Sequence, residues 1–167
     1  MGTIRSASVS FYTDVIQRDP RYTSVGRICA ADLLEPVTRA AVEAIMIASA
    51  NNGIPLIAFE TYRSQARQAQ LYAAGATQLR TVGVHAYGLA CDLVKDVGGQ
   101  PSWDGDFSFL RPLALAHGLV WGGDWGDSTV HHSFVDMVHV QRINVADQPK
   151  LFSGAWYPDA DYAPTCK

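Results

Sequence analysis

A stripe of hydrophobic residues at helical spacing follows Pro36 in the sequence. Its members share one face of a helix, and they are Val37, Ala41, Ala44, Ile45 and Ala48. Glu35 and Pro36 are typical of a helix start, and Asn51, Asn52 and Gly53 are typical of a stop. The pattern therefore predicts a long, well-buried helix between these two signals.

Three shorter hydrophobic runs are typical of strands. PLIAFE, residues 55–60, opens on a proline two positions after Gly53, so it is bounded as a strand should be. We also predict strands for GLACDLV, residues 88–94, and for MVHVQRI, residues 137–143.

Two further segments carry a helical pattern. In TYRSQARQAQLYAAG, residues 61–75, Ser64 can cap the first turn and Gly75 can close the last. DFSFLRPLALAHG, residues 106–118, ends on a glycine and places Pro112 either in its first turns or at a kink. Helices come first and short strands dominate later. We therefore predict an α+β fold, with a small antiparallel sheet and helices packed on it.

No internal repeat, low-complexity tract or charge block divides the 167 residues, a length usual for one domain. The composition, 48% hydrophobic and 17% charged, fits a packed globule with a sizeable core. We predict a single domain over residues 1–167, in which residues 1–31 are a weakly patterned leader.

Charge, hydropathy and cysteine content exclude several classes of protein. Lys and Arg total 13 against 16 Asp and Glu, so there is no basic excess to bind nucleic-acid phosphates. The longest apolar run, around residues 40–50, contains Glu43 and is too short to span a bilayer. The 3 cysteines are widely spaced without a CxxC pair, which indicates free or buried thiols. The start, MGTIRSASVSFYTDVIQRDP, lacks the pattern of a secretory signal, so we expect synthesis in the cytoplasm without a signal peptide.

Two pairs of histidine and aspartate carry the candidate chemistry. His85 and Asp92 lie seven positions apart, and Asp136 and His139 lie three apart. Side chains alternate between the faces of a strand, so Asp92 and His139 lie opposite one another, about 5 Å apart at their β-carbons, if their strands are neighbours. His85 enters from just before its strand. These nitrogen and oxygen ligands leave a fourth position open, which is typical of catalytic zinc.

Each of these residues alone also has an ordinary interpretation. A single histidine in a strand is usually a hydrogen-bonded core or surface residue, and Asp92 alone fits a cap or a turn. Burying Asp92 in an apolar strand is expensive without a cation or several donors, which favours a metal site. Spacing alone leaves both interpretations open. Asp136, on the other side of the pleat, is expected to reach the open position, where a carboxylate can take a proton from water and return it to a leaving amine.

Together the motifs resemble the zinc D,L-peptidases of the M15 group, also described as LAS-type. That family pairs His-x6-Asp with a later Asp or Glu-x2-His, matched here by His85, Asp92, Asp136 and His139. TYRSQARQ supplies the arginine and glutamine of the family as Arg63 and Gln68. The Trp-Gly-Gly-Asp-Trp block at residues 121–125 is similar to the phage endolysin-like L-alanyl-D-glutamate endopeptidases. The resemblance covers residues 35–142 and implies a fold like that of Hedgehog signalling domains and D,D-peptidases.

The resemblance implies a role for each matched residue. It implies zinc bound by His85, Asp92 and His139. It implies Asp136 as the general base and Arg63 as the cation that steadies the substrate or the oxyanion, although Arg63 also fits a structural ion pair. Gln68, Trp121 and Trp125 are expected to contact substrate, and the two tryptophans fit core packing equally well.

Three features depart from the family pattern. Gly83 stands where the family usually has serine, and Val140 follows the last histidine where phenylalanine is commoner. Residues 126–133 form an extra stretch that we predict to be a rim loop. His131 and His132 within it fit a solvated loop better than a metal site.

The resemblance implies a zinc metallopeptidase that hydrolyses a peptidoglycan stem peptide, most specifically at the L-Ala–D-Glu bond. We expect a monomeric phage or prophage endolysin that reaches the wall after holin-type release, with no nucleic-acid partner and no membrane insertion. One alternative is a D-Ala-D-Ala carboxypeptidase or dipeptidase of the same family. The other is a non-catalytic, zinc-containing cell-wall-binding module, against which the presence of Asp136 and Arg63 argues.

Overall fold

The computed structural model describes residues 11–125 and 135–164. Helix α1, Pro36–Asn51, has the predicted bounds, because the Glu35 carboxylate accepts hydrogen bonds from two backbone nitrogens of its first turn. Gly53 follows the helix at a φ of 79°, a left-handed conformation that glycine adopts without strain. The predicted start and stop signals of this helix are confirmed.

The strands form an antiparallel sheet, so the predicted α+β fold is confirmed. Its spatial order is β1-β2-β5-β4. The fifth strand, β3, pairs with β2 and is not part of that order. The bounds of the strands are β1 Leu56–Glu60, β2 Ala90–Val97, β3 Gln100–Ser102, β4 Val120–Trp121 and β5 His139–Gln141. Strand β5 is shorter than the predicted run of residues 137–143, because residues 137 and 138 form a turn. Strands β2 and β5, far apart in the sequence, are neighbours at the centre of the sheet.

Shorter helices complete the regular structure: α2 Gln65–Ala73, α3 Leu110–Ala116 and α4 Gln148–Phe152. The Ser64 hydroxyl caps α2 as predicted, since it accepts a hydrogen bond from the backbone nitrogen of Arg67 at 3.0 Å. Pro112 stands in the first turn of α3, where its missing N–H is tolerated. The sequence pattern indicated neither α4 nor β3. Short helical segments occupy Tyr12–Ile16, Ala31–Leu33, Val84–Tyr87, Gly122–Trp125 and Val145–Asp147.

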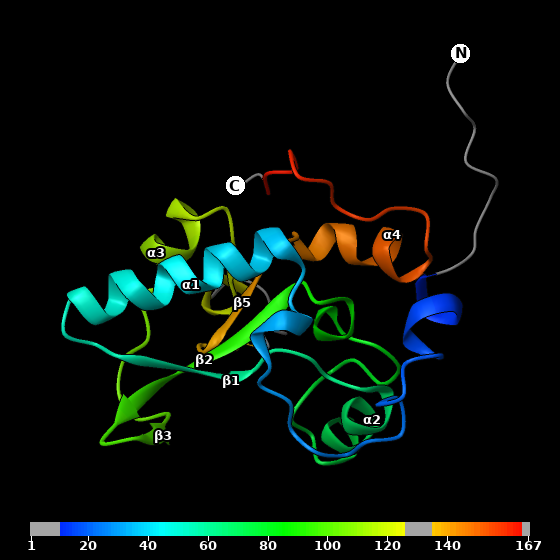
Figure 1. The fold of residues 1–167 in the computed structure, drawn as a ribbon, viewed down its shortest axis with the longest axis horizontal. Coiled ribbons are helices and arrows are strands. Elements are labelled where there is room, and N and C mark those ends of the chain that lie inside the picture. Colours follow the sequence, from blue (N-terminus) through cyan, green and yellow to red (C-terminus); the bar gives the residue numbers. More distant parts are fainter. Residues whose placement is uncertain (1–10, 126–134, 165–167) are drawn as a thin grey trace.

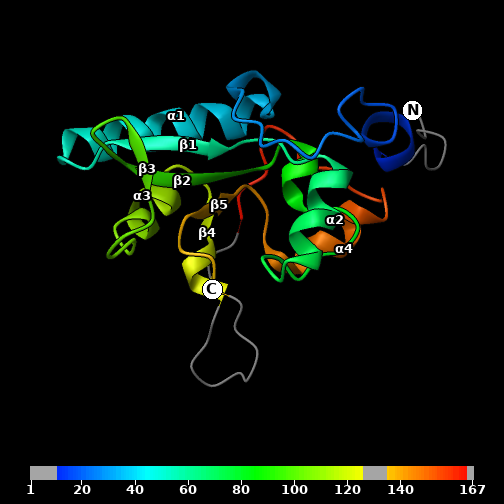
Figure 2. The same cartoon turned by 90° about the horizontal axis from the view of Figure 1, so that it is seen from below.

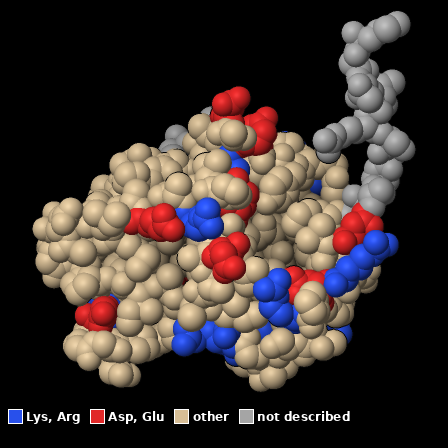
Figure 3. Space-filling model, viewed as in Figure 1, with Lys and Arg blue, Asp and Glu red and all other residues tan. Residues whose placement is uncertain are grey.

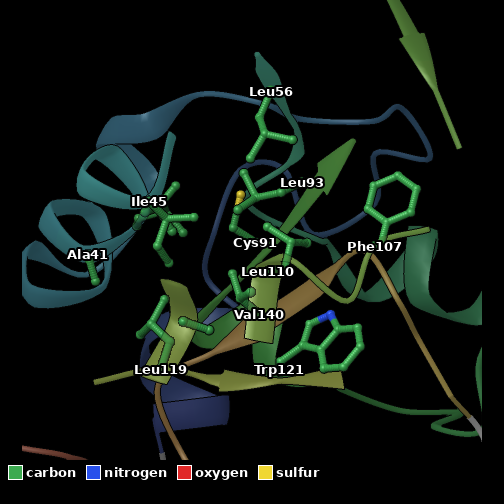
Figure 4. Close-up of a cluster of buried hydrophobic side chains, with 13 residues drawn as sticks. Ala41, Ile45, Leu56, Cys91, Leu93, Phe107, Leu110, Leu119, Trp121 and Val140 are labelled. Atoms are coloured by element: carbon green, nitrogen blue, oxygen red, sulfur yellow. The ribbon is translucent and has the colours of Figure 1, made fainter. Parts of the chain in front are cut away.

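Helices α1 and α3 lie on one face of the sheet (Figures 1 and 2). A hydrophobic cluster, called the core cluster below, joins them to that face. It draws on both helices and on the strands (Figure 4), and its labelled members are Ala41, Ile45, Leu56, Cys91, Leu93, Phe107, Leu110, Leu119, Trp121 and Val140. Fully burying one large apolar side chain stabilises a fold by about 1.5–3 kcal/mol. This layer is therefore a main source of the protein's stability.

Part of the predicted leader packs into the molecule. Ile16 is 1% exposed and belongs to a second hydrophobic cluster. The other buried members of that cluster are Val82, Val84, Ala86, Tyr87, Leu89, Ala90, Ile143 and Leu151. Ile28 also forms an isolated β-bridge with Tyr62. Residues 11–31 are thus tied to the fold, although their weak pattern did not indicate it.

The surface charges are mixed. On the face shown in Figure 3, the charged side chains lie in small groups among uncharged residues, and several groups contain both acidic and basic members. That face presents no extended field of one sign to steer a highly charged partner. Within the described ranges, no helix has both the length and the apolar character needed to cross a bilayer.

Candidate functional site

The candidate ligands come together where β2 and β5 pair. Asp92 and His139 are partners across the two strands, as predicted. His85 lies in a helical turn just before β2, and Gly88 ends that turn at a φ of 71°. A β-carbon on Gly88 would lie 2.8 Å from the Leu33 carbonyl oxygen, so only glycine lets the chain turn back at this point.

These three side chains form a compact buried group. Oδ1 of Asp92 is 3.0 Å from Nδ1 of His139 and 3.2 Å from Nε2 of His85. One possible ligand atom from each residue lies within 4.8 Å of the others. His85 is 2% exposed, Asp92 7% and His139 5%. The structure therefore brings the residues together as expected, and their role as metal ligands stays a prediction.

Burial and mutual contact set the protonation of this group. Burial by itself raises the pKa of Asp92, but the adjacent His85 and His139 rings outweigh it and hold that pKa well below its ordinary value. Burial lowers the pKa of His85. Burial also acts to lower the pKa of His139, but the hydrogen bond and the charge of Asp92 prevail and raise it. An ionised carboxylate beside a neutral His85 is the state that binds a cation.

The donor set fits a divalent cation such as zinc. Both ring nitrogens of His85 are buried, and within the described part of the chain neither makes a hydrogen bond, because the 3.2 Å approach of Nε2 to Asp92 lacks hydrogen-bond geometry. Buried polar atoms are rarely left in this state without a functional reason. A cation beside Oδ1 of Asp92 would satisfy the imidazole, and a site of two histidines and one carboxylate keeps a coordination position open.

Arg63 lies on the other side of Asp92. Its Nη2 donates to Oδ2 of Asp92 at 3.1 Å, and its Nε donates to Oε2 of Glu60 at 2.9 Å. Glu60, the last residue of β1, is 2% exposed and also accepts from Nε of Arg67 at 3.2 Å. The arginine thus holds one oxygen of Asp92 while the other faces the histidines. Sequence reasoning missed Glu60, although a charged residue ending an apolar strand three positions before Arg63 was a usable signal.

Gln68 is buried and fully engaged within the chain. Its amide nitrogen donates to Oγ1 of Thr77 at 3.2 Å and to the carbonyl oxygen of Leu79 at 2.5 Å. Its oxygen accepts from Nη1 of Arg63 at 3.4 Å. The residue therefore ties the 77–79 segment to Arg63. Its predicted contact with substrate stays a prediction.

The two tryptophans occupy different places. Trp121 is 5% exposed, belongs to the core cluster and donates from its indole nitrogen to the carbonyl oxygen of Met137 at 2.8 Å. Trp125 borders a cavity, and its ring centroid lies 4.8 Å from that of His139. Of the two interpretations given above for Trp121, the structure shows core packing. A substrate contact stays a prediction for both residues, and only Trp125 is placed to make one from the cavity wall.

The Trp-Gly-Gly-Asp-Trp block brings Asp136 into position. The backbone nitrogen of Asp136 donates to the carbonyl oxygen of Gly122 at 3.2 Å, and a β-carbon on Gly122 would collide with the carbonyl oxygen of Asp136. A β-carbon on Gly123 would collide with the ring of Trp121. The two glycines therefore allow the loop before β5 to approach closely.

A cavity of about 550 Å³ opens beside the candidate ligands. Its polar and aromatic lining includes Arg63, Gln68, His85, Trp125, Asp136 and His139. Burial raises the pKa of Asp136 above its ordinary value. That is the direction a carboxylate needs if it is to return a proton as well as accept one. One space is therefore bordered by a possible metal site, a possible general base and an arginine.

Two predictions concern residues outside the described ranges. They are the rim loop over residues 126–133 and the solvated positions of His131 and His132. Cys91 points into the core cluster, on the face of β2 away from Asp92, as predicted.

Two known proteins whose sequences are similar to this chain are named for the same peptide bond. No protein-family model matches the chain. The peptidoglycan L-alanyl-D-glutamate endopeptidase CwlK of Bacillus subtilis is 30% identical over 129 residues, which cover 66% of this chain and 74% of that protein. The L-alanyl-D-glutamate peptidase of Listeria phage A118 is 33% identical over 109 residues, 62% of this chain but 36% of the phage protein.

Solved structures extend this similarity to the fold. The L-Ala D-Glu endopeptidase ChiX of Serratia marcescens superposes with a TM-score of 0.55 at 26% identity, over 75% of this chain and 96% of that one. The LD-carboxypeptidase LdcB gives a TM-score of 0.53 at 17% identity, over 72% of this chain and 71% of that one. At such low identity the second similarity speaks for the fold alone.

Proposed function

This chain belongs to the M15 group of zinc D,L-peptidases, and we propose that it hydrolyses the L-alanyl-D-glutamate bond of the peptidoglycan stem peptide. The observation that carries the proposal is the convergence of His85, Asp92 and His139 beside a cavity that Asp136 also borders. The relatives that share this chain's sequence over most of their length are named for that bond.

The proposed metal ligands are His85, Asp92 and His139, and the metal is zinc. When bound, zinc supplies a Lewis acid and lowers the pKa of a coordinated water to about 7. The chain's part is to present the ligands in the right state. Arg63 supports this by holding Oδ2 of Asp92, which leaves Oδ1 directed at both imidazoles.

Asp136 is the proposed general base and acid. It borders the cavity from the loop before β5, where its carbonyl oxygen accepts a hydrogen bond from the backbone nitrogen of the candidate ligand His139. Its carboxylate would accept a proton from the attacking water and donate it to the departing amine of D-glutamate. Partial burial supports the second step, because a raised pKa makes the carboxyl group easier to reprotonate.

Arg63 is the proposed stabiliser of negative charge on the substrate carbonyl oxygen. Its guanidinium borders the cavity while Glu60 and Asp92 hold it in place. A rigid donor of this kind costs no reorganisation when the charge develops. The structural ion pair and the catalytic role therefore coexist in this proposal.

The proposed biological setting is phage or prophage lysis, with a monomeric enzyme that reaches the wall after holin-type release. The similarity to the phage A118 peptidase supports this setting. Because the chain spans only 36% of that phage protein, the similarity concerns one part of it.

The test is digestion of defined muropeptides by the purified full chain, with products read by mass spectrometry. We expect a disaccharide that ends in L-alanine and a peptide with a free amino group on D-glutamate, both lost with chelator and restored by zinc. Asp92→Ala serves as the inactive control. Release of D-alanine instead would establish the carboxypeptidase alternative, and zinc-loaded protein that binds wall without cleaving it would establish the binding module.

A further inference from the structure

Gln141 lies directly behind the candidate ligand His139. It is two residues further along β5, so both side chains project from the same face of the sheet. Gln141 is fully buried at 0% exposure, and its Oε1 lies 3.0 Å from Nε2 of His139. A buried amide in this position is a costly choice unless each of its polar atoms has a partner.

The second contact of Gln141 decides which way its amide points. Its Nε2 donates to the carbonyl oxygen of Ile143 at 2.6 Å. A backbone carbonyl can only accept a hydrogen bond, so the NH₂ group must face Ile143 and the oxygen must face His139. The oxygen in turn accepts only from a protonated Nε2. When His139 is protonated, Nδ1 donates to Asp92. When the ring is neutral, Nε2 keeps its proton for Gln141, so the free lone pair is on Nδ1.

We infer that Gln141 is a positioning residue that fixes the tautomer and the ring orientation of His139, so that Nδ1 binds the metal. The inference rests on the proposed zinc site. Partners of the second ring nitrogen commonly contribute 10–100-fold to metal affinity through this kind of restraint. Gln141 makes no direct contact with the metal or the substrate in this scheme.

The two imidazoles differ in this respect. The described residues offer no hydrogen-bond partner to Nδ1 of His85, the nitrogen turned away from Asp92. Of the two histidines, His139 has a partner for the ring nitrogen that faces away from Asp92, and His85 has none among the described residues. The loss of Gln141 should therefore loosen one ligand and leave the other as it is.

The test measures zinc affinity by competition with a chromophoric chelator in three variants of the full chain. Gln141→Met removes both hydrogen bonds at similar volume, and we expect zinc to bind about 10–100-fold more weakly. Gln141→Glu keeps an acceptor for Nε2 but loses the donor to Ile143, so we expect lower stability with affinity within a few-fold of the unaltered chain. Ser49→Ala, the matched control, removes a buried hydrogen bond from α1 to the carbonyl oxygen of Ile54 and should leave affinity unchanged.

These variants separate positioning from general stability. If Gln141 were merely structural, zinc affinity would follow the melting temperature, and Gln141→Glu would be as impaired as Gln141→Met. Equal affinity of Gln141→Met and the unaltered chain would overturn the inference and leave the zinc site standing. An unaltered chain that bound no zinc would remove both.

A spectroscopic measurement gives a second, independent decision. In long-range ¹H–¹⁵N spectra of the zinc-loaded chain with labelled histidine, we expect His139 to be protonated at Nε2 and coordinated at Nδ1. Gln141→Met should speed the exchange of that Nε2 proton with water. Coordination of His139 through Nε2 in the unaltered chain would refute the assigned role.

Discussion

The two faces of the β2–β5 strand pair are built from alternate residues of the same short segments and behave in opposite ways. On one face Cys91, Leu93 and Val140 lie in the core cluster beneath α1 and α3. On the other face Asp92 and His139 belong to a buried polar network. Both faces are almost completely shielded from water, yet only one of them is apolar.

The difference separates stability from chemistry. Burial on the apolar face stabilises the fold in proportion to the area removed from water. On the polar face, desolvation of a carboxylate and two imidazoles opposes folding, and buried ion pairs often do no more than offset that cost. The polar face therefore contributes little to stability, and the chemistry proposed above is assigned to it. Substitutions on the two faces should then have separable effects.

The largest effect on chemistry should follow Asp92→Ala. It removes the carboxylate that contacts both histidines and Arg63, so we expect no stoichiometric zinc and no cleavage of muropeptides. Metal content by mass spectrometry and product analysis would measure this. Full zinc occupancy in the folded variant would break the assignment of the polar face as a metal site.

Next in size is Asp136→Ala, which should retain zinc. Positioned general acid–base groups contribute about 10²–10⁴-fold to rate, and we expect turnover to fall by that factor while zinc affinity stays near that of the unaltered chain. Single-turnover cleavage and zinc titration on the same preparation would show it. Retained turnover would remove Asp136 from the mechanism.

On the apolar face, Leu93→Ala should act on stability alone. Leu93 is 0% exposed, and truncations of this kind cost about 2–5 kcal/mol of unfolding free energy. Denaturant titration would measure the loss, and the zinc affinity of the folded fraction should not change. A large fall in zinc affinity without loss of stability would show that the two faces are not separable.

Arg63→Ala tests a residue that is proposed to act both on stability and on catalysis. Loss of a charge-stabilising donor commonly raises a barrier by about 3 kcal/mol, and we expect that loss in turnover together with lower stability, because Glu60 and Asp92 each lose a partner. Arg18→Ala, on an ion pair whose arginine side chain is 76% exposed, is the matched control and should change neither. Unchanged turnover in folded Arg63→Ala would reduce Arg63 to a structural ion pair.

The last prediction concerns the reactivity of the Cys91 thiol, which we expect to resist alkylation in the native protein. Burial raises the pKa of the Cys91 thiol well above its ordinary value, so the reactive thiolate is scarce at pH 7 and stays scarce at pH 9. Cys29, by contrast, is exposed. Peptide mapping after brief alkylation should find Cys29 modified and Cys91 protected until denaturant is added. Rapid labelling of Cys91 in the native protein would contradict the tight packing of the core cluster.

Local features of the fold were predictable because they depend on neighbours in the chain. The helix stripe with Glu35 and Pro36 at its start and the Ser64 cap both describe contacts within one turn. The opposition of Asp92 and His139 followed from the two-residue period of strands, once β2 and β5 were taken as neighbours. The conversion of residues 137 and 138 from strand to turn was not visible, because it depends on the close approach of Gly122 to Asp136.

The sequence by itself determined which residue types were available and how each segment prefers to fold. Only the tertiary structure decided that Glu60 clamps Arg63, that Trp121 belongs to the core and that Gln141 supports His139. It also decided that residues near Ile16 pack into the second hydrophobic cluster. The physical reason is that periodicity and capping are set by backbone geometry over a few residues. Burial and partnership are set by which distant surfaces meet, and no local pattern records that.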